Sequence, residues 1–332
     1  MHNLIKKRGE PAYRADQLWQ WIWRKKAGDF QEMTNISKAL RSSLQQEFVL
    51  QPPAVVQKKE GIDGTVKLLL GLDDRLCIET VIIPEKGYYT QCISTQVGCP
   101  MGCVFCSTGG MGFKRNLTPG EIASQVLVAG RHLEDKGLDS TRLTNVVLMG
   151  MGEPLLNWDA VHRALGMMTD PLGPGISRRR LTLSTVGVRG RLQEFGRSRL
   201  GMLAVSLHAP DQELRRRLMP GAATWDIKDL VSALEGYPLA PRERITIEYV
   251  LLKDINDSPA QARSLVRLLS RVKCKVNLLA CNPGEQEGYQ PPPEQTILAF
   301  EEVLRSKGLT VTLRKSKGQD ISAACGQLIA DS

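Results

Sequence analysis

The sequence has no run of about 18 or more apolar residues, which excludes a helix that crosses a membrane. Residues 1–14 are charged and lack the apolar core of an export signal, so we expect a cytoplasmic protein. Disulfides persist only in oxidising compartments, so most of the eight cysteines should be thiols. Hydrophobic residues make up 42% and charged residues 24%, which is ordinary for a folded soluble protein and excludes disorder.

The net charge of +9 over 332 residues is concentrated in one stretch. Between Arg178 and Arg217 there are ten arginines and three acidic residues, so this stretch alone contributes +7. Arginine binds phosphate through two parallel hydrogen bonds, which lysine cannot do. The stretch therefore favours a face that binds nucleic acid. The alternative is a set of solvated arginines on helices and loops.

Two parts of the chain differ in their hydrophobic pattern. Residues 15–26 and 37–48 are predicted to form amphipathic helices, and residues 65–70 and 76–83 to form strands. From about residue 90, apolar runs alternate with amphipathic helices. The runs are 91–95, 145–149, 181–185, 202–207, 245–252, 276–280 and 309–313, and the helices 119–134, 158–168, 227–234, 259–270 and 294–306. This alternation predicts parallel strands with crossover helices, and it fits a full or partial barrel better than an open sheet.

Three cysteines, Cys99, Cys103 and Cys106, lie within eight residues directly after the first strand of this alternation. Thiolates are soft ligands for iron–sulfur clusters or zinc. A structural zinc site needs four protein ligands, and His132 and His162 have no pair spacing. Three thiolates without a fourth nearby favour a 4Fe–4S cluster with one iron open to a substrate or cofactor. The alternative is three buried structural cysteines.

The CxxxCxxC spacing, with Phe105 before the last cysteine, is the motif of the radical S-adenosylmethionine (SAM) superfamily. Along nearly its whole length the chain resembles the RlmN/Cfr family of adenosine methyltransferases, and more closely its RlmN branch. The resembling stretches are 9–14 (GEPAYR), 79–84 (ETVIIP), 96–106 (QVGCPMGCVFC), 112–117 (GFKRNL), 149–157 (MGMGEPLLN), 183–185 (LST), 206–210 (SLHAP), 282–283 (NP) and 320–327 (DISAACGQ).

The resemblance implies an α/β fold, namely a partial (β/α)6 radical SAM barrel with an N-terminal helical domain and a small β extension. We expect residues 1–50 to form the helical RNA-binding accessory domain and 51–88 the β extension. Residues 89–315 should form the barrel, and 316–332 a C-terminal catalytic loop. Two cofactors are implied: SAM, and a 4Fe–4S cluster held by Cys99, Cys103 and Cys106.

The implied reaction is methylation of C2 of an adenine, an sp² carbon that is not nucleophilic, so a radical route is needed. By resemblance, Cys325 carries the methyl group: one SAM methylates its thiolate, and a second yields the radical that activates the methyl group. Cys92 matches the second catalytic cysteine, which helps remove the C2 proton while a Cys92–Cys325 disulfide forms. Glu79 matches a position assigned as proton acceptor, although Cys92 can equally be the base.

Polar residues that follow predicted strands match the SAM contacts of the family. Strand ends converge on one face of a barrel, so these residues can meet around one ligand. A glutamate there suits the SAM ammonium, and serine, histidine and asparagine suit its ribose and adenine. Any one of them alone is more often structural. The expected SAM-binding residues are Gly152, Glu153, Ser184, Ser206, Leu207, His208 and Asn282.

The resemblance also implies partners. The substrates are 23S ribosomal RNA and, in some bacteria, transfer RNA, and an electron donor such as flavodoxin or ferredoxin is needed; we expect a monomer. Three alternatives stay open: methylation of C8 of the same adenine, as in the Cfr branch; a non-catalytic iron–sulfur RNA-binding protein; and a radical SAM enzyme that acts on a small substrate. Cys77, Cys274 and Cys281 have no assigned role.

Overall fold

One mixed sheet organises most of the chain in the computed structural model, which describes residues 1–282 and 288–330. Pairing is antiparallel from β1 to β4 and parallel from β4 to β12. A separate antiparallel hairpin is formed by β5 (Gln96–Gly98) and β6 (Phe113–Asn116). Within the described residues the strand order is β1 (Ala54–Glu60), β2 (Val66–Gly71), β3 (Cys77–Glu85), β4 (Tyr88–Cys92), β7 (Leu143–Leu148), β8 (Leu181–Thr185), β9 (Met202–Ser206), β10 (Ile245–Leu251), β11 (Cys274–Ala280) and β12 (Val311–Arg314).

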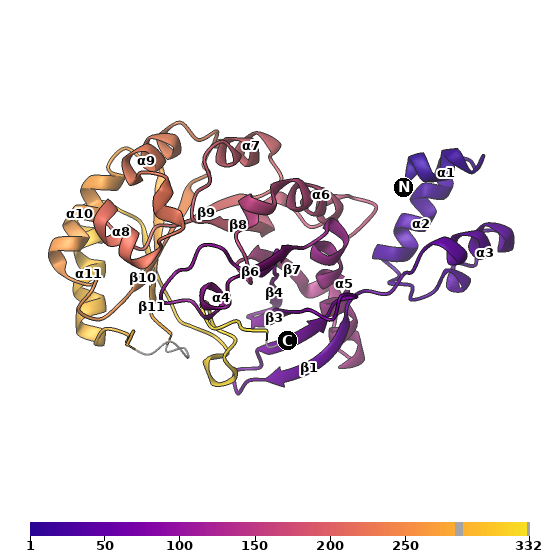
Figure 1. Ribbon diagram of the computed structural model, residues 1–332, viewed down its shortest axis with the longest axis horizontal. Helices are drawn as coiled ribbons and strands as arrows, with labels where there is room; N and C mark the ends of the chain where they lie inside the picture. The colour runs from indigo at the N-terminus through magenta and orange to yellow at the C-terminus, as the bar shows by residue number, and fades with distance from the viewer. Residues whose placement is uncertain (283–287, 331–332) are drawn as a thin grey trace.

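Crossover helices connect the parallel strands and lie along the outside of the curved sheet (Figure 1). The helices of the barrel are α4 (Ser107–Gly110), α5 (Pro119–Asp135), α6 (Trp158–Thr169), α7 (Arg191–Ser198), α8 (Gln212–Leu218), α9 (Ile227–Glu235), α10 (Pro259–Leu269) and α11 (Glu294–Ser306). Short 3-10 helices are η2 (Ser140–Arg142), η3 (Pro154–Asn157), η4 (Arg178–Arg180), η5 (Ala222–Thr224) and η6 (Gln319–Ile321). The order β4–α5, β7–α6, β8–α7, β9–α8–α9, β10–α10, β11–α11 and β12 confirms the predicted α/β partial barrel.

The two faces of the parallel strands differ, and β10 shows how. Ile245, Ile247, Tyr249 and Leu251 are buried, whereas the intervening residues, including Glu248, are only partly buried. Side chains alternate between the faces of a strand, so the apolar set packs against the helices and the other set lines the barrel interior. The strands therefore bury their outer face and leave an inner face that can take a ligand.

Strong local signals made the long helices predictable. Thr118 and Glu121 form a capping box at the start of α5, and Ser258 caps α10 in the same way. The prediction missed β1, β5, β6, α1, α4, α7 and α8. Every residue of β1 is exposed, so this edge strand has no alternating pattern to detect. In the described part of the chain no helix is both long and apolar enough to span a membrane.

The N-terminal helices form a separate unit beside the barrel (Figure 1). They are α1 (His2–Lys7), α2 (Tyr13–Trp23) and α3 (Lys38–Glu47), with the 3-10 helix η1 (Phe30–Glu32). Ile5, Leu18 and Leu44 belong to a small core distinct from that of the barrel. Lys26 forms an ion pair with Glu134 of α5, which ties the unit to the barrel.

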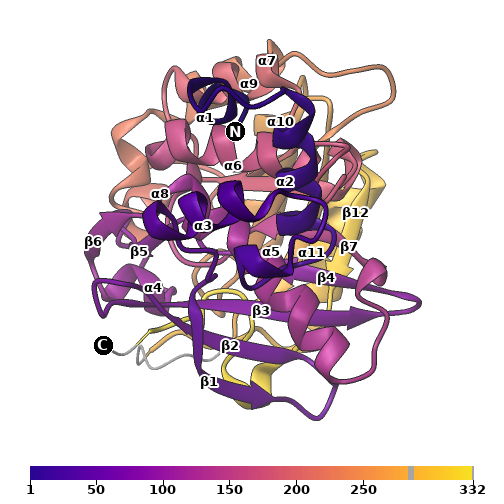
Figure 2. The ribbon, with the colours of Figure 1, turned by 90° about the vertical axis from the view of Figure 1, so that its right-hand side faces the viewer.

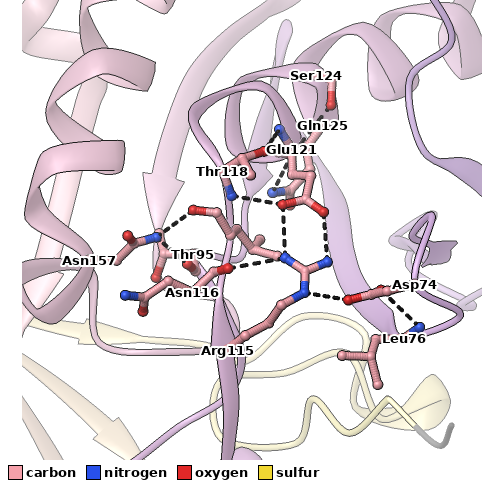
Figure 3. A network of polar contacts seen from close by, with 11 residues as sticks. Asp74, Leu76, Thr95, Arg115, Asn116, Thr118, Glu121, Ser124, Gln125 and Asn157 are labelled. Carbon is pink, nitrogen blue, oxygen red and sulfur yellow. Dashed lines mark hydrogen bonds and ion pairs between the residues drawn. The ribbon is translucent and has the colours of Figure 1, made fainter. Parts of the chain in front are cut away.

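Arg115 of β6 holds three segments together near the cysteine motif (Figure 3). Its Nε donates to Asp74 Oδ2 at 2.5 Å, and its two terminal nitrogens donate to the Glu121 carboxylate at 3.0 and 2.8 Å. Asp74 lies in the turn between β2 and β3, and Glu121 closes the capping box of α5. Arg115 therefore has a structural role within the stretch 112–117.

Candidate active site

A cavity of about 170 Å³ gathers most of the predicted site residues at the carboxyl ends of the parallel strands. Parallel strands end on one edge, so residues from distant parts of the sequence meet there. Among the expected SAM-binding residues Leu207 is the exception: its side chain is fully buried in the main core, because it alternates with the neighbouring cavity residues. Of the predicted residues, the lining includes Cys99, Cys103, Cys106, Gly152, Glu153, Ser184, Ser206, His208, Asn282 and Cys325.

The three motif cysteines occupy the loop between β5 and α4. The Cys99 amide donates to Gly112 O at 2.9 Å, and the Cys106 amide donates to Cys103 O at 3.1 Å, so the backbone fixes the loop. Burial raises the pKa of each thiol, to about 12 for Cys99. The proximity of Cys99 and Cys106 raises the pKa of Cys103 further. Without a metal the thiols hold their protons, which metal binding must displace.

These residues fit an iron–sulfur cluster better than a single ion. Among the described residues, no three His, Cys, Asp or Glu side chains gather closely enough to hold one metal ion. A 4Fe–4S cube has a different requirement, because each thiolate binds its own iron. Three sulfur ligands that line one wall of a shared cavity meet that requirement.

Glu153 is buried, and both of its carboxylate oxygens accept hydrogen bonds from the protein itself. One oxygen accepts from the Leu155 amide (2.9 Å) and the Thr185 hydroxyl (2.7 Å), and the other from the Val186 amide (2.9 Å). Burial raises the pKa of Glu153, and these hydrogen bonds oppose the shift. Gly152 precedes it with φ +101, and a Cβ there would lie 2.6 Å from the Gln96 side chain. The loop after β7 therefore requires glycine, and the carboxylate has little remaining hydrogen-bonding capacity.

Ser184, Ser206 and His208 form a polar strip across β8, β9 and the loop after β9. The Ser184 and Ser206 hydroxyls are 3.3 Å apart. His208 Nδ1 accepts from the Val250 amide at 3.1 Å, which puts the ring proton on Nε2. Burial and the nearby Arg215 lower the pKa of His208 to about 3, so the ring is neutral at physiological pH. The strip offers hydroxyl and imidazole groups but no charge.

A second cavity, of about 330 Å³, adjoins the first. Cys325 and Arg314 line both, and Cys325 is exposed because its surface faces these cavities. The second cavity is basic on balance, since Arg314, Lys315 and Lys317 in its wall outnumber the single carboxylate of Glu85. Cys92, at the end of β4, lines the second cavity. Cys325 therefore lies at the junction of two chambers with different chemistry.

The predicted disulfide between Cys92 and Cys325 is not formed: each is a free thiol. Burial, and to a smaller extent the proximity of Cys325, raises the pKa of Cys92. Although Cys325 is exposed to the cavities, the protein around it desolvates the thiol and raises its pKa, and the Arg314 guanidinium opposes that rise. The two thiols share the second cavity as separate groups.

Hydrogen bonds from distant residues hold the loop that carries Cys325. Asn282 Nδ2 donates to Cys325 O at 3.0 Å, the Ser107 amide to Gly326 O at 2.7 Å, and the Thr108 hydroxyl to Leu328 O at 2.6 Å. Gly326 has φ +85, and a Cβ there would lie 3.3 Å from Phe105 O. The backbone of this loop therefore lies against the cysteine motif. Pro283, which follows Asn282 in the stretch 282–283 that resembles the family, lies outside the described residues.

Glu79 differs from the other predicted catalytic residues in its surroundings. Within the described part of the chain it is absent from the lining of both cavities. Its Oε1 is 2.8 Å from Lys67 Nζ, and its Oε2 accepts from the Ile329 amide at 2.9 Å. Burial raises the pKa of Glu79, and the Lys67 ammonium opposes the shift. The geometry thus favours Cys92 over Glu79 as the group that faces the second cavity.

Two arginines of the stretch 178–217 have structural roles. This corrects the interpretation from charge alone, in which the whole stretch was available to bind nucleic acid. Arg215 is fully buried and donates to the carbonyls of Ala222 (3.1 Å), Trp225 (3.2 Å) and Val186 (2.6 Å). Arg178 forms a two-point ion pair with Glu243. The arginines that remain exposed to solvent are Arg179, Arg180, Arg189, Arg197, Arg199, Arg216 and Arg217.

Sequence patterns alone missed two charged residues of the first cavity, Glu248 and Arg314. Burial raises the pKa of Glu248, while Arg314 and the Asn277 side chain oppose the shift. Glu248 is a lone carboxylate in the otherwise apolar β10, and Arg314 ends β12. A charge at an inward position of a barrel strand was the available signal.

Comparison with known proteins defines the class. A family model described as the radical SAM superfamily matches residues 93–265, and one for the ribosomal RNA large subunit methyltransferase N-terminal domain matches residues 1–50. A crystal structure of a radical SAM methyltransferase from Sphaerobacter thermophilus is 40% identical. It covers 99% of this chain and 96% of its own, with a TM-score of 0.94. The fold and the cavity are those of a radical SAM enzyme, whose cofactors are a 4Fe–4S cluster and SAM.

The relatives identify the family within that class. The dual-specificity RNA methyltransferase RlmN of Solidesulfovibrio magneticus is 54% identical over 100% of this chain and 94% of its own length. The protein of the same name from Nitratidesulfovibrio vulgaris strain DP4 is 54% identical over 97% and 90%. The chain belongs to the RlmN family of RNA methyltransferases.

Proposed function

We propose that this enzyme methylates C2 of an adenine in 23S ribosomal RNA, and in transfer RNA, through a methyl group carried on Cys325. The observation that carries the proposal is the position of Cys325, exposed where the two cavities meet. When bound to Cys99, Cys103 and Cys106, the cluster supplies the electron that cleaves SAM, and two SAM molecules are used per turnover. A thiolate at the junction can take a methyl group on one side and deliver it on the other.

The first cavity suits SAM by its chemistry. The Ser184 and Ser206 hydroxyls and the neutral His208 ring can hydrogen-bond a ribose and an adenine. Asn282 lines the same wall and binds the backbone of Cys325, so it couples the cofactor site to the carrier loop. Backbone groups at Gly152 and Glu153 complete the wall where the SAM amino acid moiety would lie.

The second cavity suits the target nucleotide. Arg314, Lys315 and Lys317 can bind the phosphates that flank a base, and such contacts fix position rather than sequence. We assign Cys92 as the base that removes the C2 proton of the adenine, because its thiol faces this cavity beside Cys325. A base inside a duplex cannot enter such a cavity, so the adenine must be unpaired or flipped out. The N-terminal unit and the exposed arginines are the proposed contacts with RNA. The electron is proposed to come from a protein of the flavodoxin or ferredoxin type.

Anaerobic turnover tests the proposal. The cluster-loaded protein is given SAM, a reductant and unmodified 23S RNA or transfer RNA, and nucleosides are identified by mass spectrometry. We expect 2-methyladenosine from the wild-type protein and from Cys274→Ala, a buried cysteine outside both cavities. Cys325→Ala should give none. Formation of 8-methyladenosine would assign the chain to the Cfr branch instead, and product from Cys325→Ala would refute the carrier role.

A further inference from the structure

A buried ion pair lies on the antiparallel part of the sheet. Lys67 Nζ and Glu79 Oε1 are 2.8 Å apart, and the side chains are only 5% and 6% exposed. Lys67 pairs with Val81 and Glu79 with Leu69, so the two side chains are diagonal neighbours on one face of β2 and β3. Cys92 of β4 also pairs with Val81. The ion pair therefore lies close to the second cavity without lining it.

Both members of the pair bind the C-terminal tail (residues 316–330). Lys67 Nζ donates to Ser322 O at 3.0 Å, and Glu79 Oε2 accepts from the Ile329 amide at 2.9 Å. These contacts bracket Cys325, which lies three residues after Ser322 and four before Ile329. Figures 1 and 2 both show the tail beside this part of the sheet.

The pair and the tail depend on each other. Two buried charges are stable only when their geometry is good and further hydrogen bonds satisfy their remaining donors and acceptors. The tail supplies one carbonyl to Lys67 and one amide to Glu79. Removal of either charge leaves the other buried and uncompensated, and it also frees one side of the Cys325 loop.

We propose that the Lys67–Glu79 pair is a latch that holds the tail so that Cys325 stays at the junction of the two cavities. Both are positioning residues, which act through Cys325 and do not touch the reacting atoms. The significance for catalysis rests on the proposed function of Cys325 as methyl carrier. Methylation of Cys325 distinguishes the latch from a proton acceptor at Glu79, because Cys325 receives its methyl group before any proton leaves C2.

The test compares Lys67→Met, Glu79→Gln and Lys67→Arg in the full cluster-loaded chain. Lys58→Met, an exposed lysine on the neighbouring β1, is the matched control. Amide hydrogen exchange of the peptide that spans 322–330 measures the latch directly, and the alkylation rate of Cys325 gives a second readout. We expect at least tenfold faster exchange and alkylation in Lys67→Met and Glu79→Gln, with unchanged iron content. Lys67→Arg should restore most of the protection, and Lys58→Met should change nothing.

Activity then separates the latch from a proton-transfer role. With a latch, Lys67→Met and Glu79→Gln should slow both methylation of Cys325 and RNA methylation by a similar factor. If Glu79 is the proton acceptor, Glu79→Gln should stop product formation while the tail stays protected and Cys325 is still methylated at the wild-type rate. That second pattern would overturn the latch.

A double variant guards against misfolding. Lys67→Met with Glu79→Leu replaces the pair by apolar groups, which buried pairs often tolerate. If this folded variant keeps wild-type protection of the tail, the latch is wrong. The carrier hypothesis can fail separately: if Cys325→Ala still makes product while the latch variants free the tail, only the proposed function is refuted.

Discussion

Two regions meet at Cys325, and they are built in different ways. The strand-end wall of the first cavity draws on short motifs, such as 149–157 and 206–210, in which the residues of one stretch lie side by side. The tail has little regular structure and is held by contacts across the chain: Thr108 to Leu328, Lys67 to Ser322 and Glu79 to Ile329 are each separated by 220 residues or more. Each part of the first cavity wall thus comes from a short motif, whereas the position of Cys325, the proposed methyl carrier, depends on contacts across the whole chain.

Removal of one cluster ligand should have the largest effect. Cys103→Ala takes one of three thiolates from the wall, and a cluster held by the remaining two should be lost. We expect iron content and the iron–sulfur absorption to fall to background and turnover to vanish. The tail should keep its hydrogen-exchange protection, since none of its described hydrogen bonds uses the Cys103 side chain. Loss of tail protection in this variant would mean that the two regions are not separable.

Asn282→Ala should have an intermediate effect, because Asn282 belongs to both regions. It donates to Cys325 O at 3.0 Å and accepts from Gln319 Nε2 at 2.7 Å. Each hydrogen bond contributes about 1 kcal/mol, so loss of both should lower the rate of Cys325 methylation by roughly ten- to thirtyfold. Mass spectrometry of the Cys325 peptide after a short incubation with SAM measures that rate. An unchanged rate would show that Asn282 does not help to position Cys325 at the junction.

Arg115→Met should have the smallest effect on activity. Arg115 binds Asp74 and Glu121 but lies outside both cavities in the described part of the chain (Figure 3). The network is partly exposed, so we expect a loss of about 1–2 kcal/mol in the free energy of unfolding. Urea denaturation of the metal-free protein measures it. A large fall in turnover by the folded variant would show that the 112–117 stretch acts in the reaction.

The same contrast explains what the sequence could predict. The alternation of strands and helices predicted the barrel, because the hydrophobic pattern of each element is a local signal. The all-exposed β1 had no such signal. Glu248 was visible as a charge within the β10 run, but only the packed barrel shows that it faces the cavity. Arg215 looked like one more surface arginine, and only the packing of α8 shows that it is buried. Glu79 could be placed in a motif, but its bond to Ile329 joins residues 250 positions apart.

The most direct test of Cys325 as carrier is a single-turnover label experiment. The enzyme is first incubated with SAM that bears a deuterated methyl group, and the labelled SAM is then removed. Unlabelled SAM, a reductant and RNA are added next. We predict that the methyladenosine of the first turnover contains deuterium, because its carbon comes from the methyl group already on Cys325. Methyladenosine without deuterium in that first turnover would contradict a carrier at the junction of the two cavities.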